Sequence, residues 1–238
     1  MKSIQSIITS NLLLPSLFWS GLLLSPALWA DTLSDIAPLQ HGWAQANYKV
    51  TEDQREKAFA ALVVQADAVV AAHAGEAEPL IWRGMIKSSY AGAKGGLGAL
   101  SVAESSKADF EAAMALNAQA LQGSAYTSLG VLYSKVPGWP IGFGSSKKAK
   151  ELLEKALSIN PQGIDPNNYY AEFLFEKRDY QAAMRYLELA KQAPSRVGRE
   201  DADRDGQHNP KEKNTIASPF DIGGDPAARK ASRQSAVF

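Results

Sequence analysis

Residues 126–161 set large and small side chains at the intervals expected of two packed helices. The first segment carries two rings and a Leu–Gly pair, and the second carries small residues around a large one: Tyr126, Leu129, Gly130, Tyr133, then Ala149, Leu153, Ala156 and Pro161. A glycine in the first helix leaves a hollow that the large residue of the second helix fills, and the proline ends the second helix. This segment therefore predicts an antiparallel helical hairpin.

Two flanking segments repeat the pattern in phase. The upstream segment has Trp82 and Gly84 in a first helix, then Phe110, Ala113 and Asn117 in a second that ends without proline. The matching downstream residues are Tyr170, Ala171, Leu174, Tyr180, Ala183, Leu187, Ala190 and Pro194. Hairpins that recur in phase bury their apolar faces against one another, so the sequence favours a stack of hairpins over an unrelated helical bundle.

Helical periodicity extends beyond these three units, and no segment shows the alternation typical of a strand. From 51 to 73, apolar residues recur every three or four positions among charged ones. Alanine is frequent on these faces and allows helices to approach closely. The chain is predicted to be all-α, with helices at 51–73, 79–90, 103–116, 124–135, 147–158, 167–177 and 179–192.

The spacing resembles that of the tetratricopeptide repeat (TPR) family over residues 79–194, about half of the chain, and the central unit is the most specific match. The resemblance implies stacked antiparallel hairpins in a TPR-like right-handed solenoid. It also implies a concave surface that binds a protein or a peptide.

The central unit departs from the TPR pattern by an insertion. Ala149 stands sixteen positions after Tyr133 where the repeat leaves nine, so residues 136–144 lie in an enlarged turn. Two prolines and three glycines shape this turn, and Trp139, Ile141 and Phe143 give it apolar area. Two interpretations stay open: the rings plug the end of the helix stack, or they form the rim of a binding cleft.

The insertion reads Val-Pro-Gly-Trp-Pro-Ile-Gly-Phe-Gly and is followed by Asn160, Pro161, Gly163, Asp165 and Asn167. This combination is similar to bacterial periplasmic TPR proteins related to the T component that is associated with TRAP transporters. The resemblance implies a periplasmic helical stack that meets a substrate-binding protein and passes on an apolar ligand. It transfers no ligand residue to this chain.

Residues 1–30 have the features of a secretory signal peptide, because Lys2 precedes an apolar stretch from 12 to 24. Cleavage is expected after Ala30, with Ala27 as the competing position. The alternative is an uncleaved membrane anchor, for which the apolar stretch is short. We therefore expect a periplasmic protein with a TPR-like domain at 31–194 and a tail at 195–238.

The charge balance argues against a polyelectrolyte partner. The chain has 25 Lys+Arg, 25 Asp+Glu and no cysteine. Nucleic-acid binders cluster their cations, whereas here the two signs interleave, so no nucleic-acid partner is expected. The lack of cysteine excludes disulfides and thiolate zinc sites, and no stretch after the leader is apolar for long enough to span a bilayer.

No catalytic constellation emerges from the sequence. His41, His73 and His208 lie in separate segments, and no Gly-x-Ser-x-Gly elbow is present. The glycines at 95–98 lack the Lys-Ser/Thr end of a phosphate-binding loop and indicate a flexible linker between helices. We therefore expect neither an enzyme nor a cofactor.

The tail contains a match to the calcium loop of an EF-hand, with ligand positions at Asp201, Asp203, Asp205, Gly206 and Glu212. Prolines and a glycine interrupt the two flanking helices that would preorganise these ligands, so no metal site is expected. The tail mixes both charges without an apolar stripe. It is expected to be disordered or loosely attached.

Taken together, these features predict a non-enzymatic periplasmic adaptor, accessory to a transport system, that binds a protein or peptide such as a periplasmic substrate-binding protein. The alternative is a carrier that encloses an apolar small molecule in a cavity near Trp82, Tyr126 and Trp139. The candidate contact residues are Trp82, Tyr126, Tyr133, Trp139, Ile141 and Phe143.

Overall fold

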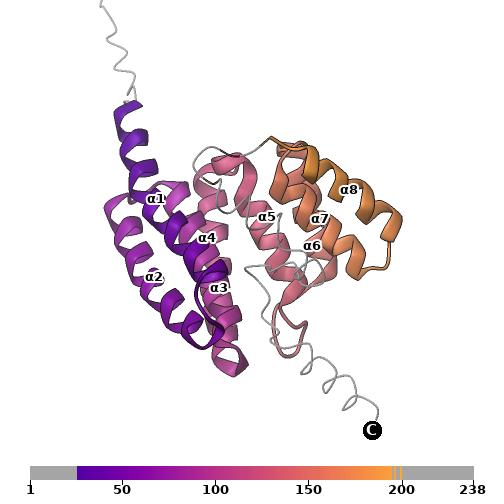
Figure 1. Cartoon of the computed structure of the whole chain (residues 1–238), viewed down its shortest axis with the longest axis horizontal. Helices are drawn as coiled ribbons and strands as arrows, with labels where there is room; N and C mark the ends of the chain where they lie inside the picture. The colour runs from indigo at the N-terminus through magenta and orange to yellow at the C-terminus, as the bar shows by residue number, and fades with distance from the viewer. Residues whose placement is uncertain (1–25, 195, 197–198, 200–238) are drawn as a thin grey trace, which may run out of the picture.

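The computed structural model describes residues 26–194, 196 and 199, with side chains from residue 31 onward except Leu97. Over these residues the chain forms eight α-helices (Figure 1). Their bounds are α1 Pro26–Tyr48, α2 Glu52–Ala72, α3 Ala77–Lys94, α4 Gly96–Asn117, α5 Ala120–Lys135, α6 Ser146–Ile159, α7 Ile164–Glu176 and α8 Tyr180–Gln192. Most of the predicted leader, the remainder of the tail and the calcium-loop motif lie outside the described residues.

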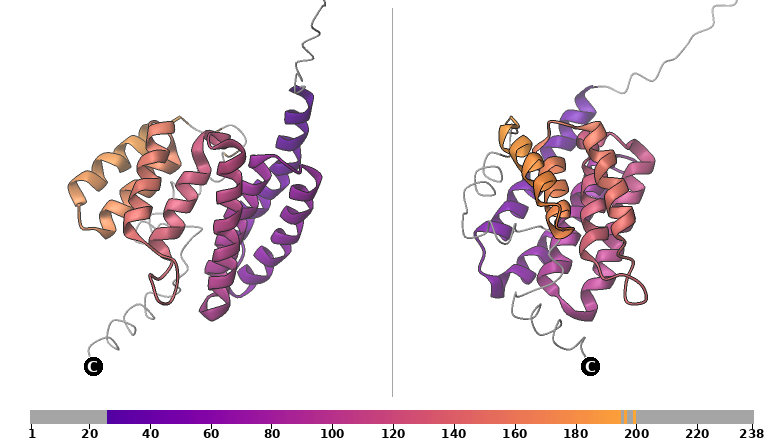
Figure 2. Two further views of the ribbon diagram at one scale, coloured as in Figure 1. Left: turned by 180° about the vertical axis from the view of Figure 1, so that it is seen from behind. Right: turned by 90° about the vertical axis from the view of Figure 1, so that its right-hand side faces the viewer.

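Consecutive helices pack as antiparallel hairpins, α1 with α2, α3 with α4, α5 with α6 and α7 with α8 (Figures 1 and 2). The predicted all-α stack of hairpins is therefore confirmed. Each of the seven expected helices is present, and the largest difference in bounds is at the start of α4.

Helix α1 is missing from the sequence prediction and adds a fourth hairpin at the N-terminal end of the stack. Its buried residues Ile36, Leu39 and Trp43 follow the helical period. Pro38 interrupts that signal, because a proline inside a helix removes a backbone hydrogen bond and usually marks a boundary. The helix begins at Pro26, so its backbone runs through the expected cleavage position.

The predicted contact between a glycine and a large residue is present in the hairpins. A Cβ atom at Gly84 of α3 would lie 2.6 Å from the ring of Phe110 in α4. A Cβ atom at Gly130 of α5 would lie 2.8 Å from Leu153 Cγ in α6. In both hairpins the absence of a side chain is therefore what allows the two helices to approach so closely.

One turn between helices is tighter than the sequence suggests, and a second agrees with the prediction. Helix α3 runs to Lys94 and α4 begins at Gly96, so the expected flexible linker is reduced to Gly95, whose φ of 61° costs glycine little. Three left-handed residues open α5 and end in Gly123 with φ 78°. The regular part of α5 therefore begins at residue 124, as predicted.

The odd-numbered helices form a continuous layer. Helix α1 contacts α3, α3 contacts α5, and α5 contacts α7, whereas no two of the even-numbered helices are in contact. Hairpins that are close on one side and apart on the other curve the stack toward the close side. We call the surface of α1, α3, α5 and α7 on that side the inner face.

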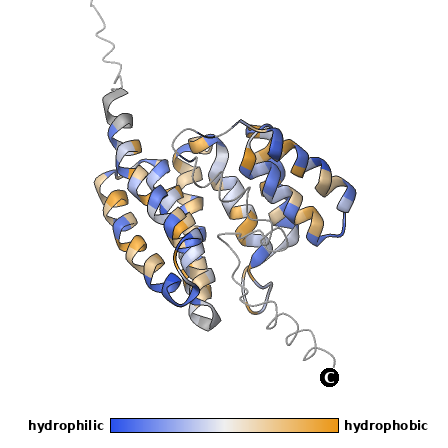
Figure 3. Ribbon diagram, viewed as in Figure 1, coloured by the Kyte–Doolittle hydropathy of each residue, from blue (hydrophilic) through white to orange (hydrophobic). Residues whose placement is uncertain are grey.

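The buried core has two parts. One part extends from α3 through α7 and includes Ile81, Phe110 and Leu153. The other joins α1 and α2 to α3 and includes Phe59 and Trp82. Apolar and polar stretches alternate along the helices, as amphipathic helices in a stack require (Figure 3). No described helix combines the length and the apolar character needed to cross a membrane.

Candidate functional site

The inserted turn between α5 and α6 is closed by its own backbone hydrogen bonds. The amide of Ser145 donates to the carbonyl of Tyr133 at 2.9 Å, which brings the two ends of the turn together. The amide of Gly144 donates to Pro137 at 2.9 Å, and the amide of Ile141 donates to Gly138 at 3.1 Å. We call residues 136–145 the Trp139 loop.

Two glycines of the Trp139 loop are required by close backbone contacts. A Cβ atom at Gly142 would lie 2.7 Å from the carbonyl oxygen of Pro137, and one at Gly144 would collide with the carbonyl of Val136. The loop is therefore folded back on itself, as the sequence predicted for a shaped turn.

The base of the loop is anchored in the core. Phe143 packs edge-on against Tyr133 with ring centroids 5.4 Å apart, and Tyr133 is only 5% exposed. Lys148 Nζ lies 5.2 Å from the Tyr133 ring centroid, and Lys107 Nζ lies 5.9 Å from that of Phe143. For Phe143 the plug interpretation therefore holds, and Tyr133 is a core residue.

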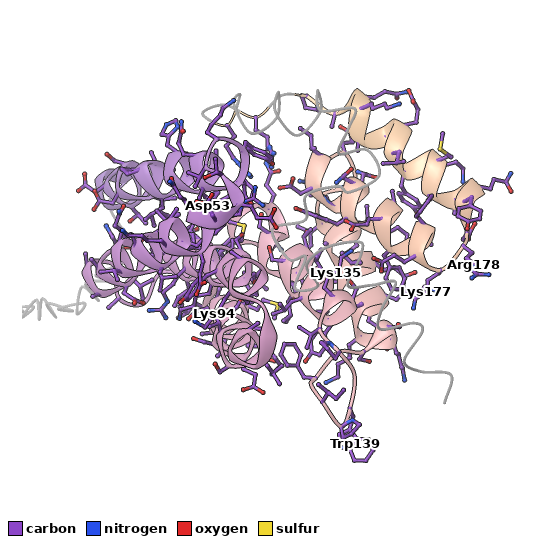
Figure 4. All side chains as sticks on the ribbon, turned by 60° about the horizontal axis from the view of Figure 1, so that its bottom comes forward. Asp53, Lys94, Lys135, Trp139, Lys177 and Arg178 are labelled. Carbon is purple, nitrogen blue, oxygen red and sulfur yellow. The ribbon has the colours of Figure 1, made fainter. Side chains whose placement is uncertain are left out.

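The tip of the loop points away from the core. Trp139 is 90% exposed and Ile141 is 68% exposed. Figure 4 shows Trp139 projecting from the end of the molecule. The plug interpretation is wrong for these two residues. A fully projecting Trp139 also lines no enclosed cavity, which removes one wall of the cavity expected for a carrier.

The other two predicted contact residues lie elsewhere. Trp82 of α3 is 2% exposed and belongs to the core that joins α1, α2 and α3. Tyr126 is half-buried on α5. The structure therefore divides the six predicted residues between the tip of the Trp139 loop, its base, the core beside α1, and α5.

A cluster that the sequence did not reveal brings Trp82 together with α7. The guanidinium carbon of Arg199 lies 5.2 Å from the Trp82 ring centroid, and Arg199 Nη1 lies 3.5 Å from Asp165 Oδ2. Arg196 Nη1 is 2.5 Å from the same Asp165 oxygen. Helices α3 and α7 do not touch, so Arg199 bridges them across the inner layer. We call Trp82, Asp165 and Tyr169 the inner-face cluster.

Tyr169 completes the cluster one turn after Asp165. Burial raises the pKa of its hydroxyl well above the usual value, and the negative charge of Asp165 raises it further, while Arg199 lowers it. The hydroxyl is therefore protonated at neutral pH. Arg199 therefore interacts with all three residues of the inner-face cluster, although the chain separates it from Trp82 by more than a hundred residues.

Acidic residues continue along the same face of α7. Glu172 and Glu176 follow Asp165 at helical spacing, and both bind Lys135 of α5, whose Nζ lies 2.5 Å and 2.7 Å from their carboxylate oxygens. Burial alone would lower the pKa of Lys135, but the two carboxylates raise it above its usual value. Lys135 therefore neutralises part of this acidic stripe, and Asp165 faces the two arginines.

The remaining polar clusters hold helices together. Asp109 of α4 accepts two hydrogen bonds from Arg83 and is 2.9 Å from Lys87 Nζ, both on α3. His73 bonds Asp35 of α1 at 2.8 Å. Among the described residues, no group of three His, Asp or Glu side chains could hold a metal ion.

Comparison with known proteins adds no relative. No protein-family model matches the chain, and no curated protein matches its sequence.

Proposed function

We propose that the protein is a non-enzymatic scaffold whose inner face binds an extended, arginine-bearing segment of a partner protein. The observation that supports this proposal is the position of the Arg199 guanidinium, which contacts the ring of Trp82 on α3 and the carboxylate of Asp165 on α7. The chain's own arginine makes the contacts that a partner's arginine would make.

The chemistry of the inner-face cluster favours arginine over other side chains. A guanidinium stacks on the face of an indole and also donates to a carboxylate from its planar edge. Lysine lacks the planar group that satisfies both contacts at once. A basic segment would also be attracted by the acidic stripe of Asp165, Glu172 and Glu176 on α7.

Two further parts of the proposal come from the sequence. The predicted leader would carry the protein to the periplasm, and the resemblance to TRAP-associated proteins suggests a substrate-binding protein as the partner. The carrier alternative is less well supported, because Trp139 is 90% exposed and closes no cavity.

Peptide binding to the full chain tests the proposal. Since Arg196 and Arg199 occupy the cluster, the variant that replaces both with alanine should bind a fluorescent peptide of sequence Ser-Arg-Val-Gly-Arg-Glu more tightly than the wild type. Adding Asp165→Asn to that variant should weaken binding about tenfold, because a charge-assisted contact is lost.

Asp53→Asn is the matched control, since Asp53 is exposed on α2 (Figure 4), a helix that contributes no residue to the inner-face cluster. It should leave the affinity unchanged. Equal affinities for the Asp165 and Asp53 variants, or no peptide binding by the double-alanine variant, would refute the proposal.

A further inference from the structure

We infer that the Trp139 loop docks the protein on an anionic lipid bilayer, with Trp139 and Ile141 at the headgroup boundary. Lys147 and Lys148, which follow the loop, would then lie against the lipid phosphates. This inference uses a different surface from the inner-face cluster and does not depend on the proposed peptide binding.

The tip of the loop has the shape and composition of an interfacial anchor. Trp139 and Ile141 are 90% and 68% exposed, although both are large and apolar. Indole rings prefer the boundary between headgroups and acyl chains, because one edge is apolar and the N–H still finds a polar partner. The loop is already ordered by its own hydrogen bonds, so insertion would cost little conformational entropy.

The backbone at the tip of the loop has few N–H groups that would lose a hydrogen bond on transfer from water to lipid. Pro137 and Pro140 have no N–H group to desolvate. The amides of Ile141 and Gly142 donate to the carbonyl of Gly138 at 3.1 Å and 3.2 Å. Unsatisfied backbone donors are costly in a lipid environment, and these internal bonds reduce that cost.

The segment that contains the loop carries only positive charge. Residues 112–150 contain four lysines and no Asp or Glu. Two of these lysines, Lys135 and Lys150, pair with glutamates of α7 and α6, which leaves Lys147 and Lys148. Lys147 and Lys148 follow the loop after Ser146 and are exposed. The turn between α7 and α8 holds two more cations, Lys177 and Arg178, which Figure 4 shows to one side of the projecting Trp139.

A hydrogen bond ties that turn to the loop region. Lys177 Nζ donates to Ser146 Oγ at 2.6 Å, which joins the α7–α8 turn to the start of α6. Lys147, Lys148, Lys177 and Arg178 form no ion pair with another described residue. Their charges are therefore available to anionic headgroups, each of which attracts a nearby lysine or arginine.

A protein partner fits the tip less well. A stable protein interface buries about 800 Å² on each side, and two side chains on a narrow projection supply only part of that area. A bilayer requires no complementary hollow, and two apolar side chains beside a group of cations are enough for reversible binding.

Sedimentation of the full chain with vesicles tests the inference. The protein should bind vesicles that contain phosphatidylglycerol and should bind pure phosphatidylcholine vesicles poorly. Trp139→Ala should reduce binding about tenfold, and replacing Lys147 and Lys148 with glutamine should reduce it by about fivefold for each lysine. Brominated lipids should quench tryptophan fluorescence in the wild type more strongly than in Trp139→Ala.

Matched variants separate the loop from the remainder of the chain. Val64→Ala removes an apolar side chain that is 69% exposed on α2 and should leave vesicle binding unchanged. Asp165→Asn should also leave it unchanged, which distinguishes this test from that of the proposed peptide binding. All variants share residues 1–30, so any binding by the leader is the same in each.

Equal binding of the wild type and Trp139→Ala would overturn the inference, as would equal binding to neutral and anionic vesicles. Copurification of a protein that is lost with Trp139→Ala, without any binding to vesicles, would show that the loop binds a protein instead.

Discussion

Gly130 determines how closely α5 and α6 approach each other. A side chain at this position would meet Leu153, whose Cγ would lie 2.8 Å from the added Cβ. Gly130→Leu should therefore lower the free energy of unfolding by about 3 kcal/mol, because overpacking forces the two helices apart. Gln181→Leu, at an exposed position of α8, is the control and should change it by less than about 0.5 kcal/mol. Urea denaturation measures both, and similar losses in the two variants would contradict the packing account.

His73 gives the stability of the N-terminal hairpin a pH dependence. Its hydrogen bond to Asp35 raises its pKa above 6.5, with further contributions from Glu76. Because the pKa is higher in the folded state, the stabilisation is complete below about pH 6.5 and is lost as the pH rises through the raised value. The urea midpoint should fall over that window in the wild type and stay flatter in Asp35→Asn. An unchanged slope in the variant would show that this pair does not couple to folding.

At the scale of elements, the Trp139 loop divides into an anchored base and a free tip. Phe143→Ala removes the ring that packs 5.4 Å from Tyr133, and it should cost about 2 kcal/mol of stability, because Phe143 is partly buried. Trp139→Ala should cost less than about 0.5 kcal/mol, since that side chain is 90% exposed. Thermal melts compare the two variants. A larger loss for Trp139→Ala would mean that the tip packs on the protein after all.

Lys135 joins α5 to α7 through two carboxylates. Its side chain is 9% exposed and that of Glu172 is 15% exposed, so Lys135→Met leaves a nearly buried negative charge without its cation. The variant should lose about 3 kcal/mol of stability. Lys150→Met is the control, because the Lys150–Glu154 pair on α6 is exposed and should contribute less than about 1 kcal/mol. Equal effects in urea denaturation would show that Lys135 acts as a surface residue.

The helices and their contacts could be predicted from the sequence where the apolar and small residues of one helix face recur at regular spacing. The glycine–large residue pairs at Gly84 and Gly130 follow from the repeat pattern, because in each unit a small residue of the first helix is matched by a large residue of the second. Helix α1 was missed because Pro38 breaks the expected pattern, although Ile36, Leu39 and Trp43 keep the period.

At the scale of the whole molecule, the inner-face cluster could not be predicted. It joins Trp82 to Asp165 through Arg199, which follows α8, and no sequence spacing relates these three residues. One part of this surface could have been predicted: Asp165, Glu172 and Glu176 are spaced so that their carboxylates share one face of a helix. The loop residues were predicted as candidates, but exposure at the tip and burial at the base depend on how the turn folds.

The affinity of the inner face for arginine tests the central proposal most directly. Isothermal titration of the variant with alanine at 196 and 199 would compare the peptide Ser-Arg-Val-Gly-Arg-Glu with a version in which citrulline replaces its second arginine. Citrulline keeps the shape of the side chain but removes the charge, so the affinity should fall about tenfold or more. Equal affinities for the two peptides would contradict recognition of arginine by Trp82 and Asp165.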